Sequence, residues 1–300
     1  MMNKYYKPSD KASRISFIYF FISIFLILPT LSWLYVYFTW LSPIIYIRPL
    51  LTVTFGGAVG LLLYYFVIGA GKVRNQNRAI LFAGIAGLLA SYYQWAFWLD
   101  VTLNPTAWVD PYHLISTNLN PVVMVSRLIE IHGTHEISIF NLHVRGMWAS
   151  LIRIAEVGII VGISVALALK KVQEPFSESQ NSWAHKVLLP PYEYIEISWW
   201  LKSTLEDDDF TFLKSIKRAT SDKKSHSIFT LYDCGEDKYY LSIINRMMSS
   251  DGNGKTKNED DEFLKQILID KASAEFLLAA ETTQLQQSHS PQTSWNMEPI

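Results

Sequence analysis

The chain has 300 residues, of which 50% are apolar, 14% aromatic and only 18% charged, and its formal net charge is −1. Residues 1–172 carry 13 Lys and Arg against 6 Asp and Glu, a balance of +7, whereas residues 173–300 carry 13 against 21, a balance of −8. This division argues against a fully soluble protein and predicts two parts in different surroundings, the second too acidic to suit nucleic acid as a partner.

Four stretches are long and apolar enough to cross a membrane as helices, because a crossing takes about 20 mostly apolar residues. We expect them at residues 15–37, 50–70, 79–99 and 147–169. The first stretch is too long for a typical signal-peptide core, and aromatic residues rather than a cleavage site mark its end. The predicted fold is an α-helical membrane bundle of four transmembrane helices, within residues 15–172, followed by a small α+β soluble domain.

Lysine and arginine gather at one side of the predicted spans. They precede the first span, fill the loop between the second and the third, and follow the fourth: Lys4, Lys7, Lys11, Arg14, Lys72, Arg74, Arg78, Lys170 and Lys171. Cytoplasmic loops carry the excess of these residues in membrane proteins. The pattern predicts a multi-pass protein with residues 1–14 and the C-terminus in the cytoplasm, and with residues 100–146 as an outer loop.

Small residues recur four apart in three spans, where they allow helix backbones to approach closely. The sets are Gly56 and Gly60; Ala83, Gly87 and Ser91; and Gly158, Gly162 and Ala166. We interpret them as contacts of a compact bundle, with a flexible or pore-lining helix as the alternative.

The fourth span contains two charged residues, Arg153 and Glu156, which share one face of a helix because they are three residues apart. Charges within a membrane are costly and usually face the bundle or a cavity. They form either an ion pair that holds the fourth span to its neighbours or part of a polar path for an ion or a proton.

The outer loop contains a short amphipathic helix by its sequence. Asn120 is a suitable N-cap, Pro121 suits the first helical position, and Gly133 is a natural stop. The same loop carries histidines that suggest a zinc site formed by His132, His135 and His143. The order of residues in the run HGTHE is not that of the His-Glu-x-x-His metalloprotease motif. A polar loop whose histidines meet water and lipid headgroups is the alternative.

The cytoplasmic α+β domain is expected at residues 173–281, and a disordered tail at 282–300. We predict a turn-rich linker at Glu174–Asn181. For residues 183–205 we expect a core helix in which Ile195, Trp199 and Leu201 face inward, or else a segment on the membrane surface. A second helix is expected at Phe210–Ala219. The strands Ser227–Leu231 and Tyr239–Ile244 should form a hairpin, and Glu259–Ala280 a long helix.

One cysteine is present, Cys234, so an internal disulfide is impossible, and we expect a small buried strand residue. Residues 249–262 partly match two known ligand-binding motifs. The run GNGKT resembles the end of a phosphate-binding loop but lacks its first glycine, and the calcium-loop spacing lacks the glycine at position 6. A solvated connecting loop accounts for both, and no cofactor is predicted.

Several segments resemble an uncharacterised family of bacterial four-span membrane proteins. They are PIIYIRPLLTVTFGGAVG at 43–60, GKVRN at 71–75, the end of the third span at Tyr93-Gln94-Trp95, and EPFSESQNSW at 174–183. The resemblance implies a bacterial inner (cell) membrane and no known activity. Relatives often carry Cys-x-x-Cys in the last segment, where this chain has Ser177 and Gln180, so a metal or redox function of the linker does not carry over.

Three functions fit these features. The first is a scaffold or accessory subunit rather than an enzyme, which sits in the lipid bilayer and binds another protein through its acidic cytoplasmic domain, with self-association as an open alternative. The second is a small transporter or channel component that uses Arg153 and Glu156. The third is a metal-dependent enzyme at the outer loop.

Overall fold

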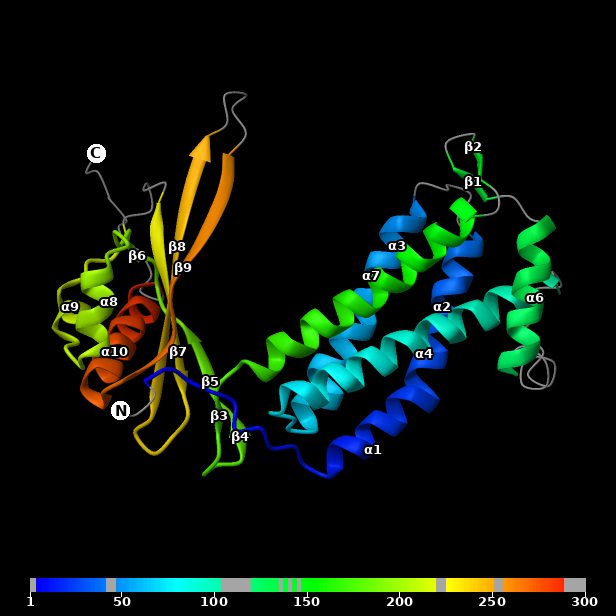
Figure 1. Cartoon of the computed structure of the whole chain (residues 1–300). Helices are drawn as coiled ribbons and strands as arrows, with labels where there is room; N and C mark the ends of the chain where they lie inside the picture. Colours follow the sequence, from blue (N-terminus) through cyan, green and yellow to red (C-terminus); the bar gives the residue numbers. More distant parts are fainter. Residues whose placement is uncertain are drawn as a thin grey trace, which may run out of the picture. The chain divides into compact units, whose positions relative to one another are not determined.

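The computed structural model describes residues 4–41, 47–103, 120–134, 137–139, 142–144, 147–219, 225–250 and 256–288. The chain divides into two compact units (Figure 1). One, the helical unit, consists of Pro8–Glu174. The other, the sheet unit, consists of Met1–Lys7 together with Pro175–Ile300. Each is described by itself below.

Among the described residues, four helices are long and apolar enough to cross a membrane: Ile15–Leu41, Arg48–Ala70, Gln76–Thr102 and Ser150–Val172. The predicted helical stretches are therefore confirmed. They comprise α1 (Ile15–Ile22), η1 (Ser23–Ile27), α2 (Leu28–Leu41), α3 (Ile47–Leu62), η2 (Leu63–Ala70), α4 (Gln76–Leu103) and α7 (Met147–Val172). Outside these come the short α6 (Pro121–Thr134) and the hairpin of β1 (Ile137–Ile139) and β2 (Leu142–Val144).

The helical unit exposes large apolar side chains and buries small polar ones. Its surface exposes large apolar side chains, among them Phe25, Leu26 and Ile154, which are each about two-thirds exposed or more. Its interior instead buries small polar side chains: Ser16, Ser23, Ser32, Thr52, Ser91 and Ser164. In water this arrangement would be unfavourable, because apolar surface would be solvated while hydroxyl groups are buried.

Two π-helical segments, η1 and η2, were not predicted. The segment η1 ends two residues before Pro29, which has no N–H and whose ring would clash with the carbonyl four residues earlier. A wider turn there relieves the clash. The segment η2 ends through backbone bonds that span five residues, from the Gly71 N–H to the Phe66 carbonyl (3.3 Å) and from the Val73 N–H to the Ile68 carbonyl (3.0 Å).

Close packing of α7 on its neighbours depends on glycines of α3 and α4. A Cβ atom at Gly56 would lie 3.1 Å from the Ile160 Cα, and one at Gly87 would lie 3.0 Å from the Val161 Cα. One at Gly60 would lie 2.6 Å from the Leu167 Cδ1. The small-residue prediction holds for these three positions.

For α7 itself the same prediction is wrong. A Cβ atom at Gly158 or at Gly162 would meet no described heavy atom within 4 Å. These two glycines therefore point to open space, and it is the bulkier residues of α7 that fit against the glycines of its neighbours.

The short helix α6 begins as predicted. The side-chain oxygen Oδ1 of Asn120 accepts a hydrogen bond from the Val122 N–H (3.1 Å), which is the N-cap geometry. The helix runs to Thr134, one residue past the glycine expected to end it.

The sheet unit is built on an antiparallel sheet with the strand order β5-β7-β8-β9, and β6 also pairs with β7. Its strands are β5 (His185–Leu188), β6 (Tyr192–Glu193), β7 (His226–Asp233), β8 (Tyr239–Ser250) and β9 (Thr256–Ile269). The helices α8 (Trp199–Glu206), α9 (Thr211–Ser215) and α10 (Lys271–Ser288) cover one face (Figure 1). The core between them includes Phe229, Leu231, Leu241, Ile243, Leu205, Leu213 and Leu277. The predicted β7–β8 hairpin is confirmed.

The helix predicted at Glu259–Ala280 is wrong in its first half. Residues up to Ile269 form β9, and α10 starts only at Lys271 and continues to Ser288, into the predicted tail. Long-range pairing with β8 outweighs the local helical pattern, and a bulge where the register shifts between Leu241 and Ile244 places Phe263 and Leu264 both in buried positions.

Other local predictions for this unit also change. The linker Glu174–Asn181 contains β3 (Phe176–Ser177), which pairs with β4 (Ser182–Trp183). Most of residues 183–205 is strand and loop, with only α8 as a helix, and the helix expected at Phe210–Ala219 shortens to α9. Within residues 183–205, β5 and β6 are strands because they pair with β7, and this pairing outweighs the expected helical pattern.

The N-terminal segment Lys4–Lys7 belongs to the sheet unit, which the sequence did not suggest. The Leu268 N–H donates to the Lys4 carbonyl (2.8 Å), and the Tyr6 N–H donates to the Gln266 carbonyl (3.0 Å). Its side chains also contact the unit, as the Tyr5 hydroxyl bonds to the Glu206 carboxylate. Burial and this carboxylate raise the pKa of Tyr5. The segment thus adds an antiparallel strand outside β9.

Candidate functional site

The two charged residues of the fourth span lie on α7 and are both half-buried. Among the ion pairs of the described residues, none joins Arg153 to Glu156. Instead the guanidinium carbon of Arg153 lies 4.9 Å from the centre of the Trp98 ring on α4, which is a cation–π contact. Glu156 interacts electrostatically with Arg153 and with Arg48. The contact of Arg153 with Trp98 therefore connects α7 to α4.

Polar groups from the neighbouring helices complete this region, which we call the polar cluster (Tyr35, Arg48, Thr52, Gln94, Trp98, Arg153 and Glu156). The hydroxyl groups of Tyr35 and Thr52 lie 3.1 Å apart, and Thr52 also donates to the Arg48 carbonyl (3.1 Å). Tyr35 interacts electrostatically with Glu156.

Gln94 lies one helical turn from Trp98 and is 7% exposed. Its carbonyl oxygen is buried and has no hydrogen-bond partner among the described residues. A buried acceptor without a partner is costly, so it often marks the place of a ligand or a water molecule. The region thus contains a carboxylate, two guanidinium groups and, one helical turn from Trp98, an acceptor without a partner among the described residues.

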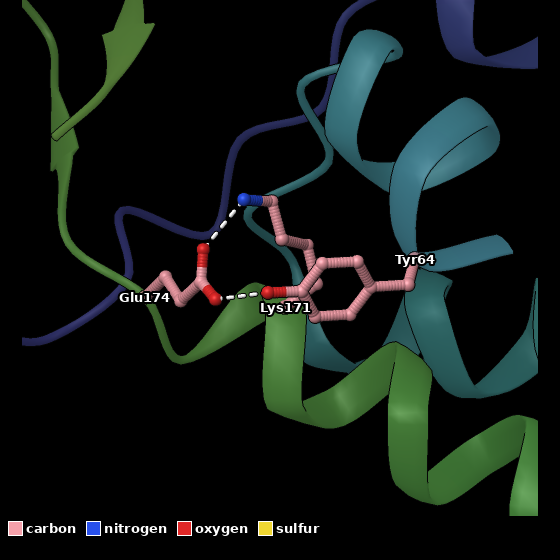
Figure 2. Close-up of polar contacts among 3 residues, drawn as sticks. All are labelled: Tyr64, Lys171 and Glu174. Carbon is pink, nitrogen blue, oxygen red and sulfur yellow. Dashed lines mark hydrogen bonds and ion pairs between the residues drawn. The ribbon is translucent and has the colours of Figure 1, made fainter. Parts of the chain in front are cut away.

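A second polar site lies where α7 ends, and Figure 2 shows its three residues. The Lys171 ammonium donates to one oxygen of the Glu174 carboxylate (2.5 Å), and the Tyr64 hydroxyl of η2 donates to the other. The same ammonium lies 5.1 Å from the centre of the Tyr64 ring. We call this set of contacts among Tyr64, Lys171 and Glu174 the latch. It joins η2 to Glu174, the last residue of the helical unit. The next residue, Pro175, cannot continue a helix.

The latch should hold the end of α7 in place. We expect Glu174→Ala to accelerate amide hydrogen exchange of Gln173 and Glu174, which close the helix through bonds to Leu169 and Lys171. Hydrogen bonds to charged groups contribute about 1.5–3 kcal/mol, so an increase of about tenfold is expected. Hydrogen exchange with mass spectrometry of residues 168–176 measures it, and Glu178→Ala, at an exposed position nearby, is the control. Unchanged exchange would show that the latch does not restrain the helix.

The structure does not test the zinc site predicted from the histidines of residues 100–146. His135 and the side chains of His132 and His143 lie outside the described residues, although α6 and β2 contain the backbones of the latter two. Among the described side chains, no three His, Cys, Asp or Glu are grouped to hold a metal ion. The zinc site therefore stays a prediction. Residues 251–255, which partly match a phosphate-binding loop and a calcium loop, also lie outside the described part of the chain.

An exposed apolar surface, which we call the α8 surface, lies on the sheet unit. It consists of Ile197, Trp199 and Trp200, which are 47%, 81% and 64% exposed. The expectation that Trp199 faces a core is wrong, although Ile195 and Leu201 are indeed buried. The helix α8 reaches the core with Leu201 and Leu205, which are four residues apart, and this leaves both tryptophans on its outer side.

The position of α8 is fixed by a buried polar network. The Asn245 side chain donates to the Ile195 carbonyl (2.7 Å) and accepts from the Ser227 hydroxyl (2.6 Å). The Ile195 N–H donates in turn to the Ser227 oxygen (3.0 Å). Both side chains are fully buried. Networks of this kind are rigid when every member is satisfied, so the chain enters α8 from a defined position.

No protein-family model, no curated protein and no solved structure matches this chain. Function must therefore be argued from the sites themselves, and the resemblance to the four-span family stays a prediction. Of the site residues, the sequence indicated Arg153 and Glu156 because they interrupt an apolar run. Tyr35, Gln94, Tyr64 and Glu174 carried no such signal, since each is ordinary in its local sequence.

Cys234 follows β7 directly and is buried, as predicted, although it lies in the turn rather than in a strand. Burial, with a contribution from Asp233, raises the pKa of its thiol to about 11. At neutral pH it is therefore an unreactive thiol, which argues against a nucleophilic or redox function.

Proposed function

We propose that this chain is a multi-pass protein of a bacterial inner membrane, with both ends in the cytoplasm, that serves as a scaffold or accessory subunit. The helical unit anchors the protein, and the sheet unit binds another protein. Support for insertion comes from the apolar surface and polar interior of the helical unit. Support for the common side of both ends comes from the sheet unit, which contains residues from before the first helix and after the last.

The observation that carries the binding function is the α8 surface. Two adjacent tryptophans that are 81% and 64% exposed are unusual on a soluble domain. Tryptophan is the residue type most enriched at the energetic centres of protein interfaces, where it buries a large area at a low cost in side-chain entropy. The network beneath α8 presents both rings from a fixed backbone, which lowers the entropy lost on binding.

The test is purification of the tagged full-length protein from its native membrane in mild detergent, with mass spectrometry of the proteins that co-elute. We expect a stoichiometric partner that is lost on deletion of residues 184–300. Trp199→Ala/Trp200→Ala should reduce its yield about tenfold or more, because an interface centre contributes about 2 kcal/mol or more.

The matched control is Leu188→Ala, which removes a 63% exposed apolar side chain from β5 of the same unit. It should leave the yield unchanged. Equal recovery with the double tryptophan variant would reject the α8 surface as the binding site. A homo-oligomer without any partner would reject the scaffold function itself.

A second function, ion or proton transport, is favoured by one specific observation, the buried Gln94 oxygen of the polar cluster, which has no hydrogen-bond partner in the described part of the chain. If Glu156 carries the ion or proton, Glu156→Gln should abolish flux into proteoliposomes, because it removes the charge while preserving the shape of the side chain. The measurement is the change of an internal pH-sensitive dye under an imposed membrane potential. Glu178→Gln, the same change in the sheet unit, is the control. Equal flux in Glu156→Gln and the unmodified protein would exclude transport through this cluster.

A further inference from the structure

The outer edge of β9 is only partly occupied. The segment Lys4–Lys7 pairs along Gln266–Leu268, and it stops at Pro8, which has no N–H to continue a ladder. From Thr256 to Leu264 no strand pairs with this edge among the described residues. Every second residue of an edge strand directs its N–H and C=O away from the sheet. The open stretch is therefore about 30 Å long and can accept another strand.

This open edge carries a concentrated negative charge. Glu259, Asp260, Asp261 and Glu262 are consecutive and all exposed. Asp260 is matched by Arg246 on β8, whose guanidinium makes two hydrogen bonds to its carboxylate (2.7 and 2.8 Å). The other three carboxylates form no ion pair among the described residues. An approaching strand therefore meets three unneutralised acids.

The chain itself shows which kind of segment this edge accepts. The strand that already lies on β9 reads Lys-Tyr-Tyr-Lys, an extended segment with a lysine at each end. Its Lys4 ammonium forms an ion pair with Asp208 (2.8 Å) of the same unit. Backbone pairing gives such a contact its affinity, while the side chains select the sequence.

We propose that the open edge of β9 binds an extended, lysine- or arginine-rich segment of a partner protein by strand addition. The bound segment would lie antiparallel or parallel to β9 beyond Pro8, with its cations near Glu259, Asp261 and Glu262. This site is separate from the α8 surface, so it goes beyond the proposed docking function and can be tested without it.

The probe is a fluorescein-labelled peptide of alternating lysine and valine, titrated with the full-length protein in detergent and followed by fluorescence anisotropy. A second peptide of the same sequence carries N-methyl groups on alternate peptide bonds, which removes the donors of one edge but keeps the charge. We expect the methylated peptide to bind about tenfold or more weakly, since strand addition depends on main-chain hydrogen bonds.

Two charge variants complete the test. Glu259→Lys/Asp261→Lys/Glu262→Lys should weaken the unmodified peptide about tenfold or more, through like-charge repulsion at the edge. Glu196→Lys/Glu236→Lys/Glu275→Lys makes the same change in net charge at exposed positions elsewhere on the sheet unit and should leave binding nearly unchanged.

Three results would overturn the proposal. Equal binding of the methylated peptide would reduce the contact to charge attraction. If both charge variants weakened peptide binding equally, the peptide would not bind specifically at the edge of β9. Absence of binding to the unmodified protein would mean that the acidic run only protects the edge from pairing, which is a common use of charge on edge strands.

Discussion

Gly87→Leu should separate α4 from α7 and destabilise the helical unit by about 1–3 kcal/mol, the usual cost of overpacking a close contact. The reason is the backbone, not a movable side chain. Even a methyl group at this position would lie 3.0 Å from the Val161 Cα and 2.9 Å from its Cγ2, so the helices must shift. Leucine adds three more carbon atoms in the same direction.

Gly84→Leu is the matched control, because it makes the same change on the same helix. A Cβ atom at Gly84 meets no described heavy atom within 4 Å, so we expect a change within about 0.5 kcal/mol. Unfolding of both variants in mixed micelles of increasing SDS content, followed by far-ultraviolet circular dichroism, gives the comparison. Equal stabilities would show that α4 and α7 do not pack through Gly87.

Asn245→Ala should destabilise the sheet unit by about 2–4 kcal/mol, because a buried group that loses its partner costs about 1–3 kcal/mol. The substitution removes the donor to the Ile195 carbonyl and the acceptor of the Ser227 hydroxyl. It should also loosen the entry into α8 and therefore weaken binding at the α8 surface. The neighbouring Arg246→Ala removes two hydrogen bonds as well, but its exposed pair with Asp260 contributes at most about 1 kcal/mol.

Cys234 provides the measurement for this pair of variants. It is the single cysteine of the chain and is buried in the sheet unit, so its alkylation reports unfolding of that unit. Pulse labelling along a urea gradient at constant pH should show an earlier transition in Asn245→Ala than in Arg246→Ala. Coincident transitions would mean that the network does not hold the unit together.

How far the sequence predicts this structure depends on how local each signal is. The four helices were predictable because an apolar run of about 20 residues is a property of the segment itself. The N-cap at Asn120 and the turn around Gly235 are equally local, and both are present. In contrast, β9 reads as a helix in isolation, and only its pairing with β8 makes it a strand.

The candidate sites follow the same division. Arg153 and Glu156 were indicated because a charge in an apolar run is conspicuous. Their contacts were not, since the ring of Trp98 comes from another helix. The α8 surface was misjudged because a tryptophan beside buried leucines looks like a core residue until the helix is oriented. The entry of the chain into α8 is held by the hydrogen bond from Asn245 to the Ile195 carbonyl, and Asn245 is far from α8 in the sequence.

The strand formed by Lys4–Lys7 has a consequence for biosynthesis. Tyr5 pairs with Ile267, so a segment that is synthesised before the four helices waits for one that is synthesised after them. Contacts between such distant residues form late in folding. In the proposed topology the sheet can close only when an even number of helices has crossed the bilayer, because its first and last strands must reach the same compartment. In a chain that inserts one helix wrongly, the backbone of Gln266–Leu268 would lack its partner segment, while β9 could still pair with β8.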